Sequence, residues 1–284
     1  MSKANLLQCL EQRFGEQLPW PQGCLDAQQT EALLALASRA SHRQWLEQPV
    51  DPALLRLLVG VAMSAPSKSD LQQVEFIEVR SADQRAAVQD LVPSMPWIAQ
   101  APVLMVVCGT GARFRMAFER AGQPFVNEHL DGMFNPTTDA AMALMHLLVA
   151  AGAAGLAGVP ISVLRDRASE LARILVLPEH VFPVAGLCLG YPSGARSVTP
   201  RFALQASLHV DRHGGGGAAL DPALDEFDRR YQAFRQSHLP VGASPAGTWS
   251  QDKTRQYAST QRADWGAFLR EQGFKTADEF DAGP

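Results

Sequence analysis

The spacing of apolar residues along the chain changes repeatedly between the period of a helix and that of a strand. Leucine and alanine recur at helical spacing from Ala27 to Ser38. A second helix is predicted to begin at Asp51-Pro52, because a carboxylate can cap the first turn and proline is tolerated within it. Apolar residues continue at helical spacing until Pro66, which ends that helix.

Four short apolar runs predict strands, at Val74–Val79, Val103–Cys108, Val159–Leu164 and Val184–Leu189. The second and fourth runs are apolar throughout, which is typical of strands buried on both faces. Helices are predicted between the strands. Ser81 begins one of them, with Gln84 completing a capping box, and Ala168–Val176 forms another. This interleaving predicts an α+β or α/β fold with a mixed sheet.

The segment Asp139–Ala151 is predicted to be a helix that is apolar on nearly every face. Methionine, leucine and valine occupy some positions, and alanine, which permits close approach of another helix, fills most of the others. A helix without a solvent-facing side is buried either at the centre of a domain or in the core of a dimer. Met145 lies in the middle of the segment, and we expect it at a twofold interface.

The two ends of the chain carry weaker patterns. Residues 1–28 have the character of a loosely organised extension. Toward the other end, Gly214–Gly217 predicts a flexible loop, Asp221-Pro222 predicts the start of a helix, and Trp249–Gln272 predicts a last helix.

Composition limits the classes of partner. The 284 residues carry a formal net charge of −4, so the chain has no general field for nucleic acid or an anionic membrane, and we expect neither as a partner. The longest apolar stretch, Ala140–Leu156, is shorter than the ~20 residues of a spanning helix. The first residues lack the apolar core of a signal peptide, which predicts a cytoplasmic protein. Cys108 and Cys188 lie in strand-like runs and are expected to be buried.

Three motifs of well-known chemistry fail on spacing. Gly109 and Gly111 follow a predicted strand, but Phe114 stands where a dinucleotide-binding fingerprint needs a third glycine. Ser193 is one place too far from Gly190 for a nucleophile elbow. The seven histidines include no HExxH motif for zinc. The sequence therefore gives no support to side-chain nucleophilic or metal catalysis.

Two segments offer local positive charge in this acidic chain. Arg39 and Arg43 are four residues apart, so on a helical turn they would share a face with Ser41 between them. Arg201 follows Thr199-Pro200, just after the last predicted strand. Two guanidinium groups and a hydroxyl suit a phosphate dianion. Taken alone, each segment is more often a solvated face.

A third segment joins the helix that ends near Pro66 to the first predicted strand. It supplies hydroxyls from Ser67 and Ser69, an ammonium from Lys68 and an amide from Gln72. These groups can hydrogen-bond a polyol and the edge of a heteroaromatic ring. The same residues are also unremarkable in an ordinary loop.

Taken together, these segments resemble the FMN-dependent nitroreductase superfamily, most closely its oxygen-insensitive nitroreductase and flavin reductase branch. The matching stretches are Arg39-Ala40-Ser41-His42-Arg43-Gln44-Trp45, Ser67-Lys68-Ser69-Asp70-Leu71-Gln72, Gly158-Val159-Pro160-Ile161-Ser162-Val163-Leu164-Arg165, Gly186-Leu187-Cys188-Leu189-Gly190-Tyr191-Pro192 and Thr248-Trp249-Ser250. Their order and spacing together are more specific than any one of them. The resemblance covers about residues 36–276.

The resemblance implies an α+β fold, with a central mixed sheet flanked by helices, in an intertwined homodimer that binds FMN between subunits. It implies three regions: an N-terminal extension at 1–35, an FMN-binding core at 36–210, and a C-terminal helical extension at 211–284 that wraps the dimer. The cofactor-binding residues implied are Arg39, Ser41, Arg43, Pro66, Ser67, Lys68, Ser69, Gln72, Pro160, Ile161, Ser162, Val163 and Arg201. Arg235 and Arg262 are the candidates for holding the nicotinamide nucleotide.

The chain departs from this branch at several places. Thr199 stands where the branch has lysine, and Ser162 where it has glycine. Asp70 places a carboxylate near the expected ring, which would disfavour an anionic reduced flavin. Pro245 and Ala246 occupy the place where basic residues for an NADPH phosphate are expected.

Two functions are compatible with the matches to this branch and the departures from it. The first is an NAD(P)H oxidoreductase that reduces nitroaromatics, quinones or flavins by ping-pong hydride transfer through FMN, without a catalytic side chain. The second is an FMN-binding protein with a sensing, storage or sequestering role and little reductase activity. The departures from the branch motivate the second.

Overall fold

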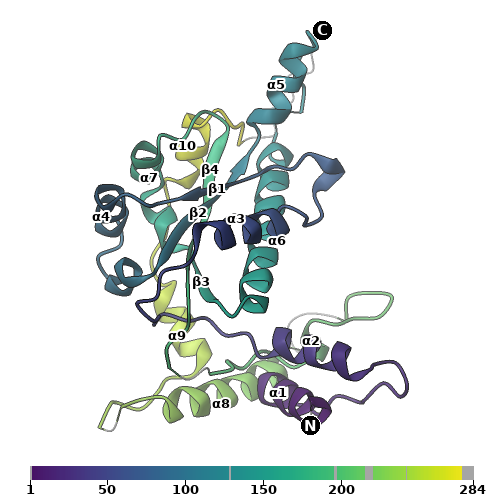
Figure 1. Ribbon diagram of the computed structural model, residues 1–284. Helices are drawn as coiled ribbons and strands as arrows, with labels where there is room; N and C mark the ends of the chain where they lie inside the picture. The colour runs from purple at the N-terminus through teal and green to yellow at the C-terminus, as the bar shows by residue number, and fades with distance from the viewer. Residues whose placement is uncertain (1, 128, 195–196, 215–219, 241, 277–284) are drawn as a thin grey trace. The chain divides into compact units, whose positions relative to one another are not determined.

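The computed structural model describes residues 2–127, 129–194, 197–214, 220–240 and 242–276 (Figure 1). The chain divides into two compact units. The first consists of Met1–Ala40 and Ala195–Gln261, and the second of Ser41–Gly194 and Arg262–Pro284.

The second unit is built on a four-stranded sheet in the order β1-β2-β4-β3. Its strands are β1 (Val74–Glu78), β2 (Val103–Thr110), β3 (Ala157–Ile161) and β4 (Val181–Gly190). All three strand pairings are antiparallel. The α+β class is therefore confirmed, whereas the described sheet is antiparallel rather than mixed. An apolar run shows that a strand is buried, but not the direction of its neighbours.

Helices cover both faces of this sheet (Figure 1). Alternate residues of β2 divide between two cores: Met105 packs in one with α3 (Pro52–Ala62) and α6 (Asp131–Ala153), while Leu104 packs in the other with α4 (Ala82–Asp90) and α7 (Ala168–Leu175). Every residue of β2 is buried, because both faces of the strand are covered. This confirms the interpretation of its continuous apolar run.

Local signals placed several helix starts correctly. The Asp51 carboxylate accepts a hydrogen bond of 2.7 Å from the backbone N–H of Ala53, and proline follows it in α3. Ser81 Oγ accepts from the backbone N–H of Gln84 at 3.2 Å. The reciprocal half of the predicted capping box is absent, because the Gln84 side chain faces the Ser81 hydroxyl instead. The strand predicted to reach Leu164 ends at Ile161 and turns into the 3-10 helix η3 (Val163–Arg167).

The long helix α6 begins eight residues before the predicted start. It runs through Pro136, and the Thr137 and Thr138 hydroxyls donate to backbone carbonyls of the preceding turn. This part of the helix was not predicted, because it contains a proline and several polar residues and lacks the apolar pattern of the rest. Asp139 is therefore not a helix start but a buried residue inside the helix. None of the helices in the described part of the chain is long and apolar enough to cross a bilayer.

The first unit is helical. It contains α1 (Ser2–Phe14), α2 (Ala27–Ala37), the 3-10 helix η4 (Leu204–Ala206), α8 (Asp221–Ser237) and α9 (Trp249–Gln256). The prediction that residues 1–28 are loosely organised is wrong for α1. This helix packs against α2 and buries Leu6 and Cys9 (Figure 1). The helix predicted to start at Asp221 is confirmed. Of the predicted glycine loop, Gly214 is non-helical, and residues 215–217 lie outside the described ranges.

The last predicted helix is instead two helices. After α9 the chain leaves helical geometry, and the second unit contains α10 (Trp265–Glu271). Arg262 lies between them with a φ of 55°, which interrupts any continuous helix. The remaining elements of the second unit are α5 (Ala112–Arg120) and the 3-10 helices η1 (Lys68–Asp70) and η2 (Pro96–Gln100).

Candidate functional site

The serine-rich segment before β1 forms an unusual exposed turn. Ser69, Asp70 and Gln72 have φ values of 51°, 57° and 51°. Residues other than glycine seldom adopt this left-handed region, and such strain persists only where surrounding contacts hold it. Lys68 and these three residues are exposed. The backbone therefore presents their side chains to solvent in one fixed arrangement.

A buried carboxylate from α6 holds this turn in place. Asp139 is 2% exposed. Its two oxygens accept hydrogen bonds from Ser67 Oγ at 2.7 Å, from the backbone N–H of Lys68 at 2.9 Å and from that of Gln73 at 3.0 Å. Ser67 Oγ in turn accepts from the backbone N–H of Gln72 at 2.7 Å. Hydrogen bonds to an ionised group are about twice as strong as neutral ones, so this carboxylate can offset the strain of the turn.

Asp139 is a site residue that pattern reasoning missed. The signal was present, since a lone carboxylate followed by twelve uncharged residues up to Ala151 requires buried partners if it lies inside a helix. Its partners also change the role of Ser67. The Ser67 hydroxyl donates to Asp139, so its single proton is no longer available to a ligand.

Helix α5 contacts the same turn through one side chain. Arg113 donates to the backbone carbonyl of Gln72 at 2.7 Å and forms an ion pair with Glu75 on β1 at 3.3 Å. Three aromatic side chains follow it, with ring centroids 5.0 to 5.3 Å apart in edge-to-face pairs: Phe114, Phe118 and Phe125. These three rings pack on one another and are partly buried.

The segment around the end of β3 lies on the opposite edge of the sheet from β1. Because all described pairings are antiparallel, β3 runs toward the end of the sheet at which β1 begins. It ends part-way there, since Ile161 is level with Ile77 through the pairs with Gly186 and Val106. Pro160 and Ile161 pair with Leu187 and Gly186 of β4. The Ile161 side chain is buried, so this residue can meet a ligand only through its backbone.

Ser162 and Val163 follow directly, at the change from β3 to η3. Ser162 is exposed and Val163 is partly buried. Their backbone amides come after the last strand pair, Ile161 with Gly186. These amides are therefore outside the ladder of β3 and β4, as a role in contacting a ligand requires.

A cluster of arginines forms in the first unit. Arg39 and Arg201 line one pocket of about 700 Å³, together with Arg13 from α1 and a wall of apolar residues, among them Leu6 and Leu10. Burial, and then the neighbouring Arg201 guanidinium, lowers the pKa of Arg39. Nη1 of Arg39 is buried and makes no hydrogen bond within the described ranges. A buried cationic donor without an acceptor is the condition that an anionic ligand relieves.

Arg39 and Arg43 do not share a helical turn, contrary to the sequence prediction. Helix α2 ends at Ala37, and the chain continues in non-helical conformation through Arg43. Ser41 and Arg43 belong to the second unit, where the Arg43 guanidinium lies over the ring of Trp97 with 5.7 Å to its centroid. A bridge between Trp45 and Pro192 draws this segment onto the sheet, which explains why the helix does not continue.

The two arginines expected at the nicotinamide nucleotide belong to different units. Arg235 is exposed on α8. Arg262 forms an ion pair with Asp166, with Nε and Oδ1 at 2.8 Å, so a nucleotide phosphate would compete with this carboxylate. Their joint role therefore stays a prediction.

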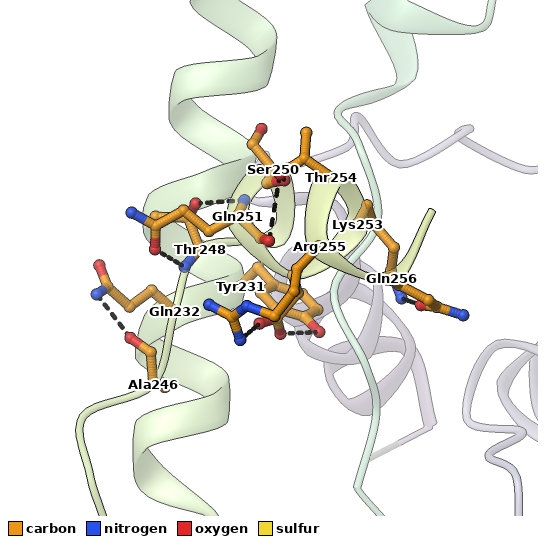
Figure 2. A network of polar contacts seen from close by, with 11 residues as sticks. Tyr231, Gln232, Ala246, Thr248, Ser250, Gln251, Lys253, Thr254, Arg255 and Gln256 are labelled. Atoms are coloured by element: carbon orange, nitrogen blue, oxygen red, sulfur yellow. Dashed lines mark hydrogen bonds and ion pairs between the residues drawn. The ribbon is translucent and has the colours of Figure 1, made fainter. Parts of the chain in front are cut away.

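Helix α9 carries two cations close to its capped start. Thr248 and Gln251 form a capping box at the helix start, and Lys253 and Arg255 follow in the next turn (Figure 2). The Arg255 guanidinium lies 3.9 Å from Asp252, which also accepts a hydrogen bond of 3.1 Å from the Tyr231 hydroxyl. Burial, and then this hydrogen bond, raises the pKa of Tyr231.

The cysteines of the sheet behave as apolar core residues, as predicted. Cys108 and Cys188 are fully buried and free. Burial raises the pKa of each thiol to about 12, so neither is a thiolate nucleophile at neutral pH. Within the described ranges there is no group of three or more His, Cys, Asp or Glu residues placed to hold a metal ion.

Comparison with known families places these features in context. The model of the "Nitroreductase family" matches residues 36–191, which is more than half of the chain. The chain belongs to the nitroreductase family. A second model, "Nitroreductase family, C-terminal domain", matches residues 199–277. The family assignment from the sequence motifs is confirmed, and α1 precedes both matched ranges.

The chain aligns with curated relatives over nearly the whole length of each relative. The chain is 28% identical over 247 residues to "FMN reductase [NAD(P)H]" of Bacillus subtilis, covering 86% of this chain and 98% of the relative. It is 28% identical over 241 residues to "Oxygen-insensitive NADPH nitroreductase" of Salmonella typhimurium, covering 85% and 97%. The solved structure of Bacillus megaterium NfrA2 is similar with a TM-score of 0.81 at 29% identity, covering 87% of this chain and 99% of that one. The nitroreductase fold is thus shown.

Proposed function

We propose that this protein is an NAD(P)H oxidoreductase that uses FMN to reduce nitroaromatics, quinones or flavins in a ping-pong reaction. The observation that carries the proposal is the buried, unpaired Nη1 of Arg39 beside Arg201, which fits the phosphate of FMN. The relatives named FMN reductase and NADPH nitroreductase support the reaction class.

The residues present fit the cofactor in two separate places. Arg39 and Arg201 offer guanidinium groups to the phosphate, and Ser41 and Arg43 are expected to join them. Lys68, Ser69 and Gln72 are exposed on the turn held by Asp139, and we assign the ribityl chain and ring edge to them. Pro66 precedes this turn, and Ser67 acts through Asp139 rather than through direct donation.

The protein contributes position and electrostatics to the reaction. When bound, FMN supplies the redox chemistry by taking hydride from a nicotinamide and passing it to an acceptor. Backbone amides near Ile161, Ser162 and Val163 would donate to negative charge that develops on the ring. The turn held by Asp139 would fix the ring edge, and the aromatic side chains that follow Arg113 would exclude water and stack on an electron-poor acceptor.

We further propose that the enzyme is a homodimer joined through α3 and α6. One stripe of α3 is exposed at helical spacing and carries a single charge; it comprises Ala53, Arg56, Leu57, Gly60, Val61 and Ser64. Leu57 is 63% exposed, and Met145 on the adjoining helix α6 is 45% exposed. Exposed apolar side chains beside small residues suit close helix packing, and a second copy of the same chain is the commonest partner for such a face.

A second function is favoured by one group of residues. Asp70 presents an exposed carboxylate on the turn and accepts a hydrogen bond from Gln72 Nε2 at 3.2 Å. Thr199 and Ser162 replace the lysine and glycine that the resemblance implies. These residues support an FMN-binding protein with little reductase activity, because Thr199 removes a positive charge beside Arg201 and Asp70 adds a negative charge near the expected ring, where it disfavours an anionic reduced flavin.

One experiment separates the two functions. The absorbance spectrum of the purified protein is recorded without air, before and after mixing with NADH or NADPH. Rapid bleaching of the yellow band, and parallel double-reciprocal plots with a quinone, are expected of the reductase. A yellow protein that does not bleach supports the binding protein. Colourless protein that takes up no FMN refutes both.

A further inference from the structure

Helix α1 lies before the residues that match the family, yet its last cation enters the arginine pocket. The Arg13 guanidinium donates to the backbone carbonyl of Ala37 from Nε at 3.1 Å and from Nη2 at 2.8 Å. Nη2 also donates to the carbonyl of Arg39 at 2.9 Å, and Nη1 donates to that of Thr199 at 3.4 Å. One side chain therefore joins the segment that carries Arg39 to the segment that carries Arg201.

The backbone of Arg13 completes this connection. Its carbonyl accepts a hydrogen bond of 2.6 Å from the backbone N–H of Arg201. Arg230 on α8 donates to the carbonyls of Arg13 at 3.3 Å and of Arg201 at 2.8 Å. The end of α1 is thus held on both sides, and the position of Arg201 depends on it.

The pocket concentrates positive charge without a matching carboxylate. In the part of the chain that the structure describes, Arg13, Arg39 and Arg201 form no ion pair with an acidic side chain. Glu16 is near in sequence, but its carboxylate accepts from the backbone N–H of Leu204 at 2.6 Å. Burial, and then the Arg201 guanidinium, lowers the pKa of Arg13. Like charges held together beside an apolar wall favour a bound anion, because the low dielectric strengthens its attraction.

We propose that Arg13 is a positioning residue of the FMN phosphate site, which holds Arg39 and Arg201 in place and adds a third positive charge to the pocket. This inference rests on the proposed function. Arg13 takes the place of the charge that Thr199 lacks, since Thr199 contributes only a hydroxyl that accepts from Arg201 Nη1 at 2.8 Å. The segment before the family core thereby becomes part of the cofactor site.

The test compares FMN with riboflavin, which has the same ring and ribityl chain but no phosphate. Dissociation constants for both are measured by fluorescence quenching, at low and high salt, for the wild type, Arg13→Met and Arg13→Lys. Lys3→Met is the matched control, because it removes a cation from the same helix, where Lys3 lies over the Trp20 ring. Thermal melting of every variant reports folding.

We expect Arg13→Met to weaken FMN binding about 10- to 100-fold, in the range of one charge-assisted hydrogen bond, and to leave riboflavin binding within about twofold. Its FMN affinity should also depend less on salt. Arg13→Lys keeps the charge but not the planar fork, so a smaller loss of FMN binding is expected. Lys3→Met should bind both flavins as the wild type does.

Three outcomes overturn the inference. Unchanged FMN affinity in Arg13→Met and Arg13→Lys shows that Arg13 does not serve the phosphate. Equal losses for FMN and riboflavin show a purely structural role. If Arg13→Met does not fold, Arg13→Lys decides between these results. A wild type that binds neither flavin refutes the proposed function itself, and this inference with it.

Discussion

Replacing Asp139 by asparagine tests whether one buried carboxylate holds the turn at Lys68–Gln72. Asparagine keeps the shape of the side chain but has one accepting oxygen instead of two. In the structure one carboxylate oxygen accepts from Ser67 Oγ and the Gln73 amide, while the other accepts from the Lys68 amide. The asparagine NH₂ would therefore face at least one donor, and that donor would be left buried without a partner.

The magnitude follows from these contacts. A hydrogen bond to a charged group contributes about 1.5–3 kcal/mol, and a buried donor without an acceptor costs a similar amount. We expect Asp139→Asn to lower the free energy of unfolding by about 2–3 kcal/mol, which corresponds to a decrease of about 3–5 °C in Tm for a chain of 284 residues. Because the positive φ values of Ser69, Asp70 and Gln72 would lose their anchor, FMN affinity should also fall.

The assay combines denaturant unfolding, thermal melting and FMN titration. Asp70→Asn is the matched control, because Asp70 lies on the same turn, is exposed, and accepts a side-chain hydrogen bond only from Gln72 among the described residues. We expect this control to change the unfolding free energy by less than about 0.5 kcal/mol. An Asp139→Asn protein as stable as the control, with wild-type FMN affinity, would refute the reasoning.

Three further predictions concern the thiols, the interface and the phosphate site. In the folded protein at pH 8, a thiol reagent should modify exposed Cys24 and spare buried Cys108. The pKa of Cys108 is raised to about 12, so its thiolate fraction is negligible. Rapid modification of Cys108 contradicts this prediction. Met145→Asp should give folded monomers that lose FMN. The exposed site tolerates a carboxylate in a single chain, but burying that carboxylate at an interface costs several kcal/mol. Gel filtration and absorbance measure the outcome, and a yellow dimer excludes this interface. Arg43→Ala should weaken FMN retention more than Lys68→Ala, since a guanidinium on a phosphate makes charge-assisted bonds; equal dissociation constants reject the assignment.

Strands and helix caps were the predictable part of the fold. The continuous apolar run of β2 was recognisable because both of its faces are buried, and Asp51 placed the start of α3 through one local hydrogen bond. The direction of neighbouring strands was not predictable, because it depends on contacts between β2 and β4 that are far apart in the chain. Pattern reasoning succeeded where a residue's environment was set by its own element.

The candidate site was predictable as a set of segments but not as a geometry. The motifs identified the turn at Lys68–Gln72, yet Asp139, which holds it, lies 66 residues or more along the chain. Arg39 and Arg43 have helical spacing, but the helix ends at Ala37. Arg13 lies in the N-terminal extension, outside the residues over which the sequence resembles the family. In each case a long-range contact overrode a local pattern.

The edges of the described sheet limit how copies of this chain can associate. β3 is an edge strand, and Pro160 within it has no N–H to offer to an added strand. β1, at the opposite edge, carries Glu75 and Glu78, each paired with an arginine. Proline and charge at sheet edges are features that discourage strand-to-strand growth into aggregates. The chain can therefore expose apolar helix faces for assembly while its sheet remains protected from runaway polymerisation.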